Sequence, residues 1–152
     1  MPGEHVRYMQ LALAEAERAR GTTGDNPWVG AVIVVGSEIV GRGSTKPPGQ
    51  DHAEIAAIHD AISRGASIEG ATIYSTLEPC SFVGRTPACA LAIAEHRIAR
   101  VVIGMRDPHP RVNGEGVRIL RDAGIEVLEG ICEPEVAASL ATWIETYHPR
   151  PA

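Results

Sequence analysis

Two cysteines and a histidine–glutamate pair are the residues of this chain whose types could do chemistry. His52 and Glu54 stand two residues apart in the segment DHAE. Cys80 and Cys89 lie in the segment PCSFVGRTPAC. One imidazole and two thiolates are good zinc ligands, and three protein ligands leave the fourth tetrahedral position to water. The pattern therefore predicts one catalytic zinc ion per chain, held by His52, Cys80 and Cys89.

Glu54 is placed to move protons beside such a metal. Bound zinc lowers the pKa of its water to about 7, and a neighbouring carboxylate can take and return protons. Glu54 is close to His52 in sequence yet free to face a substrate. The zinc deaminases carry an H-x-E motif followed by P-C-x-x-C, whereas here Cys89 follows Cys80 by nine residues.

The long spacing between the cysteines leaves two other interpretations open. Buried free cysteines often serve as small hydrophobic residues, so C-x8-C alone is poor evidence for zinc. A disulfide is the other interpretation. The N-terminal stretch carries Glu4, Glu15 and Glu17 within its apolar pattern, which rules out a signal peptide. We therefore expect a reducing, cytoplasmic compartment, where a structural disulfide is disfavoured.

The composition indicates one globular domain that acts on a small molecule. The chain has 152 residues, of which 44% are hydrophobic and 22% charged. This length falls within the roughly 100–200 residues of one domain, so residues 1–152 are predicted to form a single domain. No apolar run is long enough to span a membrane. The net charge of −5 and the absence of a basic stripe disfavour a nucleic-acid partner.

Helix and strand signals alternate and place the candidate residues at element junctions. Short apolar runs predict strands at 30–35, 38–43, 71–76, 100–105 and 125–130. Helical spacing predicts helices at 4–20, 51–65, 87–98, 114–124 and 134–147, with Asp51 as the N-cap of the second. We expect the first two strands to form a hairpin at Gly36-Ser37.

Five strands interleaved with five helices predict a mixed sheet covered by helices on both faces. Strands that a helix separates should pair in parallel through right-handed crossovers. In such sheets the chemistry collects where strand ends meet helix N-termini. Both DHAE and PCSFVGRTPAC fall at that kind of junction.

Several segments together resemble the deaminase domain of the bifunctional riboflavin biosynthesis deaminase–reductases. They are TTGDNPWVGAVIV, HAE, ATIYSTLEPCS, GRTPAC, RVVIGMRDP and AGIEV, and the resemblance runs from about Tyr8 to Leu140. In that family a long segment separates the two cysteines. The resemblance implies zinc on His52, Cys80 and Cys89, with Glu54 as proton shuttle. It also implies an α/β fold, the three-layer α-β-α cytidine-deaminase-like fold with a central mixed five-stranded sheet.

The chain departs from the family pattern in segments that line the family's substrate. Thr45 stands where the family has the histidine of G-x-H, Phe82 where it has the histidine of C-S-H, and His109 where it has the asparagine of D-P-N-P. Phe82 would offer an apolar face to a heterocycle. Asn26 matches the family, and Arg85 could meet a phosphate. These five are the predicted substrate-binding residues, and we expect intact catalytic machinery in an altered pocket.

The sequence is therefore interpreted as a zinc-dependent hydrolase that uses water to replace an exocyclic amino group of a pyrimidine-like heterocycle. By resemblance, the best substrate is the diaminohydroxyphosphoribosylaminopyrimidine of riboflavin biosynthesis. A deaminase re-specialised for another nucleobase, nucleoside or aminated metabolite, a tRNA-editing deaminase and a non-catalytic zinc module are the alternatives. The chain ends at HPRPA where the family's reductase domain would begin, so it is either a monofunctional deaminase or a part of a longer protein. We expect a homodimer or higher homo-oligomer by analogy.

Five further residues carry weaker signals. His59 shares a helix face with the predicted ligand, and a packed or surface role is favoured because a catalytic site needs an open metal position. Trp28 is expected either to roof the pocket or to pack. Cys132 has no partner at metal-ligand spacing and is interpreted as a core or surface thiol. Trp143 and Tyr147 form a hydrophobic stripe that is either core or interface.

Overall fold

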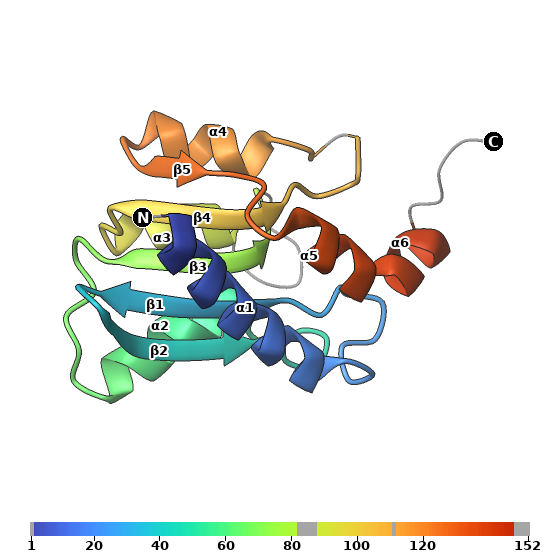
Figure 1. Cartoon of the computed structure of the whole chain (residues 1–152), viewed down its shortest axis with the longest axis horizontal. Coiled ribbons are helices and arrows are strands. Elements are labelled where there is room, and N and C mark those ends of the chain that lie inside the picture. The colour runs from blue at the N-terminus through green and yellow to red at the C-terminus, as the bar shows by residue number, and fades with distance from the viewer. Residues whose placement is uncertain (1, 82–87, 111, 148–152) are drawn as a thin grey trace.

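The computed structural model describes residues 2–81, 88–110 and 112–147. Five strands form one sheet in the order β2-β1-β3-β4-β5 (Figure 1). The strands are β1 Gly30–Val35, β2 Glu38–Ser44, β3 Thr72–Leu77, β4 Arg100–Met105 and β5 Glu126–Leu128. The helices are α1 Pro2–Ala19, α2 Ala53–Ser63, α3 Cys89–Glu95, α4 Glu115–Asp122, α5 Glu133–Ser139 and α6 Ala141–Tyr147. The predicted mixed five-stranded α/β fold is confirmed.

The strand directions differ from the prediction at one crossover. β1 and β2 form the expected antiparallel hairpin, and β3, β4 and β5 pair in parallel as predicted. The prediction that β2 and β3 pair in parallel across α2 is wrong, because β1 lies between them and pairs antiparallel with β3. The hairpin leaves β2 at the sheet edge, so the crossover through α2 reaches past β1.

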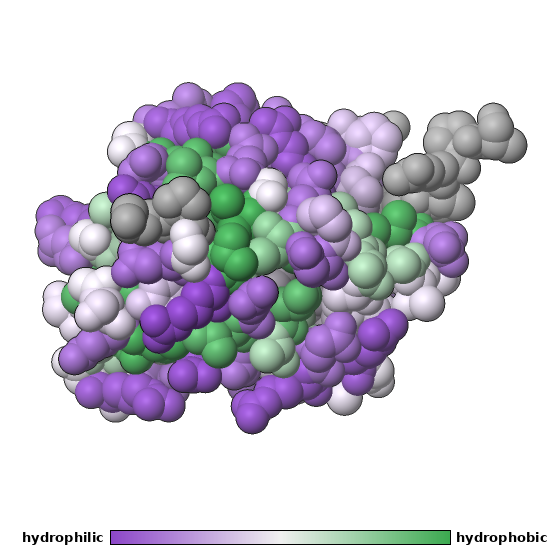
Figure 2. All heavy atoms as spheres, viewed as in Figure 1, coloured by the Kyte–Doolittle hydropathy of each residue, from purple (hydrophilic) through white to green (hydrophobic). Residues whose placement is uncertain are grey.

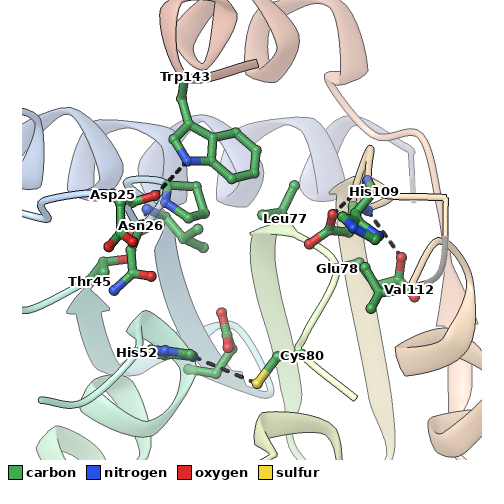
Figure 3. A pocket seen from close by; sticks show the side chains of 14 residues that line it. Asp25, Asn26, Thr45, His52, Leu77, Glu78, Cys80, His109, Val112 and Trp143 are labelled. Atoms are coloured by element: carbon green, nitrogen blue, oxygen red, sulfur yellow. Dashed lines mark hydrogen bonds between the residues drawn. The ribbon is translucent and has the colours of Figure 1, made fainter. Parts of the chain in front are cut away.

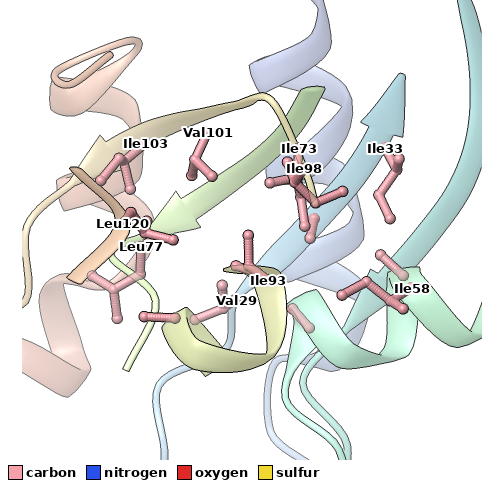
Figure 4. Packing of buried hydrophobic residues seen from close by; sticks show 14 of the residues in the cluster. Val29, Ile33, Ile58, Ile73, Leu77, Ile93, Ile98, Val101, Ile103 and Leu120 are labelled. Atoms are coloured by element: carbon pink, nitrogen blue, oxygen red, sulfur yellow. The ribbon is translucent and has the colours of Figure 1, made fainter. Parts of the chain in front are cut away.

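Helices cover both faces of the sheet, as predicted. α1 and α5 lie in front of the sheet in Figure 1, and α2 and α3 lie behind it, with α4 packed beside α3. Strand side chains alternate between the two faces, so Val32 and Val102 pack toward α1 while Ile33 and Val101 face the other layer (Figure 4). Figure 2 shows many hydrophilic side chains over the α1 face, with hydrophobic atoms visible beside that helix.

Two glycines of β2 let α2 come very close to the sheet. A Cβ atom added at Gly43 would lie 2.4 Å from the backbone nitrogen of Ala57, and one at Gly41 would lie 2.5 Å from the Ala57 carbonyl oxygen. Real Cβ contacts are not this short, so only glycine allows the approach. The close packing fixes the start of α2, and with it His52 and Glu54.

The helix boundaries correct two predictions. His52, not Asp51, is the N-cap of α2, with an extended backbone (φ −73°, ψ 167°), and Asp51 Oδ2 lies 3.0 Å from Nδ1 of His59. The predicted helix 87–98 is shorter than expected: it ends at Glu95, and Arg97 takes a left-handed φ of 57°. No helix in the described part of the chain is long and apolar enough to cross a membrane.

The predicted closing helix 134–147 is wrong, because two helices occupy that stretch. α5 ends at Ser139, whose carbonyl oxygen accepts the indole N–H of Trp28 at 3.2 Å. In a continuous helix that carbonyl would accept the backbone N–H four residues on. The indole takes its place, and the chain turns at Leu140 into α6.

Candidate active site

The three predicted metal ligands converge from two helix starts and one strand end. His52 is the N-cap of α2, Cys89 is the first residue of α3, and Cys80 lies three residues beyond the end of β3. Their ligand atoms all lie within 4.8 Å of one another. His52 Nδ1 is 3.2 Å from the Cys89 sulfur and 3.7 Å from the Cys80 sulfur.

These distances fit a tetrahedral zinc site. Zn–S bonds of about 2.3 Å and Zn–N bonds of about 2.0–2.1 Å place sulfur and nitrogen about 3.6 Å apart. The two separations in the structure, 3.2 and 3.7 Å, bracket that value. Cys80 and Cys89 are not joined in a disulfide, which contradicts the disulfide interpretation. Thiolate and imidazole ligands favour zinc over harder cations such as magnesium.

Two backbone hydrogen bonds hold the cysteines together across the nine-residue spacing. The N–H of Cys89 donates to the Cys80 sulfur at 3.1 Å, and the N–H of Ala90 donates to the Cys80 carbonyl at 3.1 Å. The first turn of α3 is therefore fixed to Cys80, three residues beyond the end of β3. These bonds bring Cys80 and Cys89 together although eight residues separate them in the sequence.

The two thiols share their protons unequally. A hydrogen bond from the Cys89 thiol is the main cause that lowers the pKa of Cys80 to about 5. The same hydrogen bond, followed by burial, raises the pKa of Cys89. Metal ligation requires both thiols to lose their protons, so binding releases protons and depends on pH. The sulfur atoms of Cys80 and Cys89 are suited to bind a divalent cation.

Glu54 lies one residue into α2 and is buried, with 3% of its surface exposed. Burial raises the pKa of its carboxyl group, and the hydrogen bond from Ser75 opposes that change. Ser75 Oγ lies 3.0 Å from Glu54 Oε1. A carboxyl group with a raised pKa beside a metal site can serve as both proton acceptor and proton donor near neutral pH.

A cavity of about 450 Å³ opens above these residues. His52 and Cys80 line one end of it, and Trp143 lies at the opposite end (Figure 3). Glu54 also lines the cavity. Asp25, Asn26 and Thr45 line one side, while Leu77, Glu78, His109 and Val112 line the other (Figure 3). The volume is in the range of small-molecule sites.

The structure brings three of the five predicted substrate-binding residues to this cavity. Asn26, Thr45 and His109 line it. The Thr45 hydroxyl, however, accepts the backbone N–H of Val29 at 2.9 Å, so it also serves the backbone beside β1. Phe82 and Arg85 lie outside the described residues.

Several lining residues were missed by the sequence interpretation. Trp143 was assigned to a hydrophobic stripe, but its indole N–H donates to the Asp25 carbonyl at 2.9 Å and its ring faces the cavity. Glu78 and Asp107 stand in segments already quoted for the family resemblance, LEPC and RDP, which was the available signal. Asp25 likewise stands in the quoted segment TTGDNPWVGAVIV, whereas Trp143 lies outside every segment quoted for the resemblance.

The weaker candidates take other positions. His59 is exposed and pairs with Asp51, in agreement with a surface role. Trp28 packs against the core, with the Arg20 guanidinium 5.1 Å above its ring, and is not among the described lining residues. Cys132 is half-buried and has a left-handed φ of 60° at the start of α5.

The fold and the ligand set define a zinc enzyme in which three protein ligands sit beside a buried carboxyl group. Residues 2–105 match the family described as the cytidine and deoxycytidylate deaminase zinc-binding region. The chain belongs to this deaminase family, and His52, Cys80 and Cys89 form its zinc-binding site. The predicted cofactor is confirmed.

Within this family, the chain is similar to proteins of riboflavin biosynthesis. The chain is 49% identical over 128 residues to the riboflavin biosynthesis protein RibD of Aquifex aeolicus, covering 84% of this chain and 35% of that protein. It superposes with a TM-score of 0.88 and 40% identity on a diaminohydroxyphosphoribosylaminopyrimidine deaminase/5-amino-6-(5-phosphoribosylamino)uracil reductase from Thermotoga maritima, covering 95% of this chain and 41% of that one. The predicted resemblance to the deaminase part of the riboflavin proteins is confirmed, and the chain spans about a third of the length of the RibD relative.

A transfer-RNA enzyme shares the fold at lower identity. A structure from a study of A-to-I editing by tRNA:A34 deaminases has a TM-score of 0.68 and 32% identity to this chain, covering 88% of this chain and 99% of that one.

Proposed function

We propose that this chain is a hydrolytic deaminase of diaminohydroxyphosphoribosylaminopyrimidine. The observation that carries the proposal is the buried Glu54 carboxyl group beside the His52, Cys80 and Cys89 centre, at one end of a cavity sized for a small heterocycle. The names of the Aquifex and Thermotoga relatives support the choice of substrate.

The reaction replaces the exocyclic amino group on a ring carbon with an oxygen atom from water. Water forms a C–O bond, the exocyclic C–N bond breaks, and ammonia leaves. Zinc, when bound, supplies the Lewis acidity that makes water nucleophilic near neutral pH. Glu54 accepts a proton from the attacking water and delivers it to the ring nitrogen. It then accepts the second proton from the hydroxyl group now on the ring carbon and passes it to the departing amino group.

The walls of the cavity orient the substrate. Asn26 offers an amide that can donate to and accept from ring substituents. The Trp143 ring, at the end away from the metal ligands, offers an apolar face for the heterocycle or its sugar. His109 lies on the side wall, where an imidazole can hydrogen-bond a polar substituent, and Arg85 is the residue proposed for the phosphate.

A tRNA-editing function is the second candidate, because the tRNA deaminase structure covers nearly all of its own length in the comparison. The net charge of −5 disfavours it. Polynucleotide binding relies on basic residues that neutralise phosphates.

The decisive experiment measures ammonia release from the diaminopyrimidine phosphate with zinc-loaded protein. The comparison is Glu54→Gln, which keeps the shape of the side chain but cannot carry the proton, and turnover should fall by about 10²-fold or more. Glu129→Gln, outside the cavity, is the matched control and should keep activity. Turnover of tRNA or free nucleosides instead of this substrate would reject the proposal in favour of the respective alternative.

Two further features belong to the proposal. We treat residues 1–152 as one domain, and we expect a homodimer or higher homo-oligomer. Ile62 on α2 and Leu91 on α3 are each 49% exposed, and the two helices are neighbours on one face of the sheet. Light scattering after size exclusion measures the assembly, and a monomeric mass would contradict that expectation.

A further inference from the structure

Glu78 is a buried carboxyl group that the proposed chemistry does not use. It follows the last residue of β3 and precedes Cys80 by two residues. Only 5% of its surface is exposed. Its backbone N–H donates to the Met105 carbonyl at 2.9 Å, which continues the pairing of β3 with β4. The residue is therefore held rigidly between the sheet and the metal ligand.

The Glu78 carboxyl group accepts three backbone N–H groups from one stretch of chain. Oε1 accepts those of Asp107 at 3.1 Å and Gly114 at 3.0 Å. Oε2 accepts that of Val117 at 3.1 Å. Both oxygens are thus engaged with the backbone, which distinguishes Glu78 from Glu54 and removes it from proton transfer.

The same carboxyl group supplies the N-terminal cap of α4. Gly114 is the N-cap residue of that helix, has a φ of 84° and has no side chain with which to cap it. Val117 is the third residue of the helix, so its N–H is one of the groups left without a partner inside the helix. Glu78 provides the partner from a different element.

The start of α4 is packed directly on the segment that holds Glu78. A Cβ atom added at Gly116 would lie 2.1 Å from the Pro79 carbonyl oxygen and 3.2 Å from Glu78 Oε2. Glycine is therefore required at this contact. The first turn of α4 cannot shift toward the residue before Cys80, and hydrogen bonds prevent it from moving away.

Residues 107–110 and 112–114 form a wall segment of the cavity, and its two ends, Asp107 and Gly114, are anchored to one oxygen atom of Glu78. Asp107, His109 and Val112 from this stretch line the cavity. Within it, Asp107 Oδ1 accepts the backbone N–H of His109 at 2.8 Å. A line of hydrogen bonds thus runs from Glu78 through Asp107 to His109, beside the residues labelled in Figure 3.

We propose that Glu78 is a positioning residue that holds the wall segment of residues 107–110 and 112–114 in register with the metal ligands. Because Glu78 and Cys80 belong to the same short segment after β3, the wall and the metal centre are fixed to one another. The inference rests on the proposed function, since substrate affinity is one of its readouts. It predicts that replacing Glu78 raises KM by a larger factor than it lowers kcat.

The test compares Glu78→Gln with Val127→Ala in zinc-loaded protein. The amide keeps the shape of the side chain but turns an NH₂ group toward at least one backbone N–H. We expect KM to rise by about ten-fold, with kcat within about two-fold and zinc content unchanged, because small misplacements in a site have large effects. Val127 is buried on β5 and controls for a general loss of stability. An unchanged KM, or an equal KM change in Val127→Ala, would overturn the proposal.

Amide hydrogen exchange gives a readout that does not depend on turnover. The N–H groups of Asp107, Gly114 and Val117 should be slow to exchange in the wild-type protein and fast in Glu78→Asp, whose shorter side chain cannot reach both ends of the wall. Fast exchange of all three in the wild type refutes the proposal even if neither variant folds. Absence of wild-type turnover rejects the proposed function, while the exchange pattern still decides the role of Glu78.

Discussion

Ser75 Oγ lies 3.0 Å from Oε1 of Glu54 and 2.8 Å from the carbonyl oxygen of Leu77. Ser75 is fully buried in β3, so the strand itself orients the proposed proton carrier. The Ser75 hydroxyl group has one hydrogen, so it donates to only one of these two oxygen atoms at a time.

Removing this hydroxyl should impair the chemical step. For Ser75→Ala we expect kcat to fall by about ten-fold with KM nearly unchanged, because Glu54 loses the contact that fixes its side chain. Steady-state kinetics at saturating zinc measures both constants. Ser81→Ala, a serine adjacent to Cys80 in sequence, is the comparison. A purely KM-based effect in Ser75→Ala would contradict the orienting role.

Replacing one metal ligand should abolish zinc binding. We expect Cys89→Ser to bind less than about a tenth of the wild-type zinc, because a serine hydroxyl is a far poorer zinc ligand than a thiolate. Metal content is measured by elemental analysis after dialysis against buffer without chelator. Cys132→Ser is the matched control, since Cys132 is not part of the ligand cluster. Zinc retained in Cys89→Ser at the wild-type level would refute the ligand assignment.

Trp143 should affect substrate binding and stability separately. Trp143→Phe keeps an aromatic face but loses the hydrogen bond to Asp25, which costs about 1 kcal/mol of unfolding free energy. Trp143→Ala also loses the apolar wall and should raise KM by about ten-fold. Denaturant unfolding and steady-state kinetics are measured on both variants. An equal KM for alanine and phenylalanine variants would show that the ring does not contact the substrate.

The ion pairs of Glu129 with Arg106 and Arg121 should make the stability of the fold depend on pH in the acid range. Hydrogen bonding to Arg106 is the main cause that lowers the pKa of Glu129 below its ordinary value of 4.5, and Arg121 adds a contact at 3.1 Å. A carboxyl group with a lowered pKa in the folded state stabilises the fold above its unfolded pKa. That contribution is lost as pH falls through the lower, folded pKa.

Glu129→Gln should therefore lower the melting temperature at neutral pH. The difference from wild type should shrink as pH falls below about 4.5 and vanish once the pH is below the lowered pKa of Glu129. Thermal melts between about pH 3 and 7 measure the difference between wild type and variant. Glu69→Gln removes an exposed ion pair with Arg97 at 3.8 Å and should follow the wild-type curve, because such surface pairs contribute little. A constant difference between Glu129→Gln and wild type at all pH values would contradict the prediction.

The close approach of α2 to the sheet predicts a strong effect of a single methyl group. Gly43→Ala should destabilise the protein by about 1–3 kcal/mol, because the added Cβ meets the backbone of α2. Gly3→Ala is the control, since a Cβ atom there would meet nothing within 4 Å. Denaturant unfolding of zinc-loaded protein gives both values, and equal stability of the two variants would refute the packing argument.

The metal site could be predicted from the sequence because the signals for it lie in the ligand residues and their immediate neighbours in the chain. The types of His52, Cys80 and Cys89 define the ligand chemistry, and the helix and strand signals around them place all three at element junctions. The alternation of apolar runs and helical periodicity likewise determined the fold class. Each of these signals spans only a few neighbouring residues.

Only the tertiary structure decided how the cavity is walled and how the sheet is ordered. Trp143 and Asp25 meet across 118 positions of sequence, and Glu78 reaches Val117 across 39. The antiparallel pairing of β1 with β3 and the break between α5 and α6 also depend on such distant partners. Periodicity and residue type describe which face of an element is apolar, but they do not specify which distant backbone group a buried side chain will find.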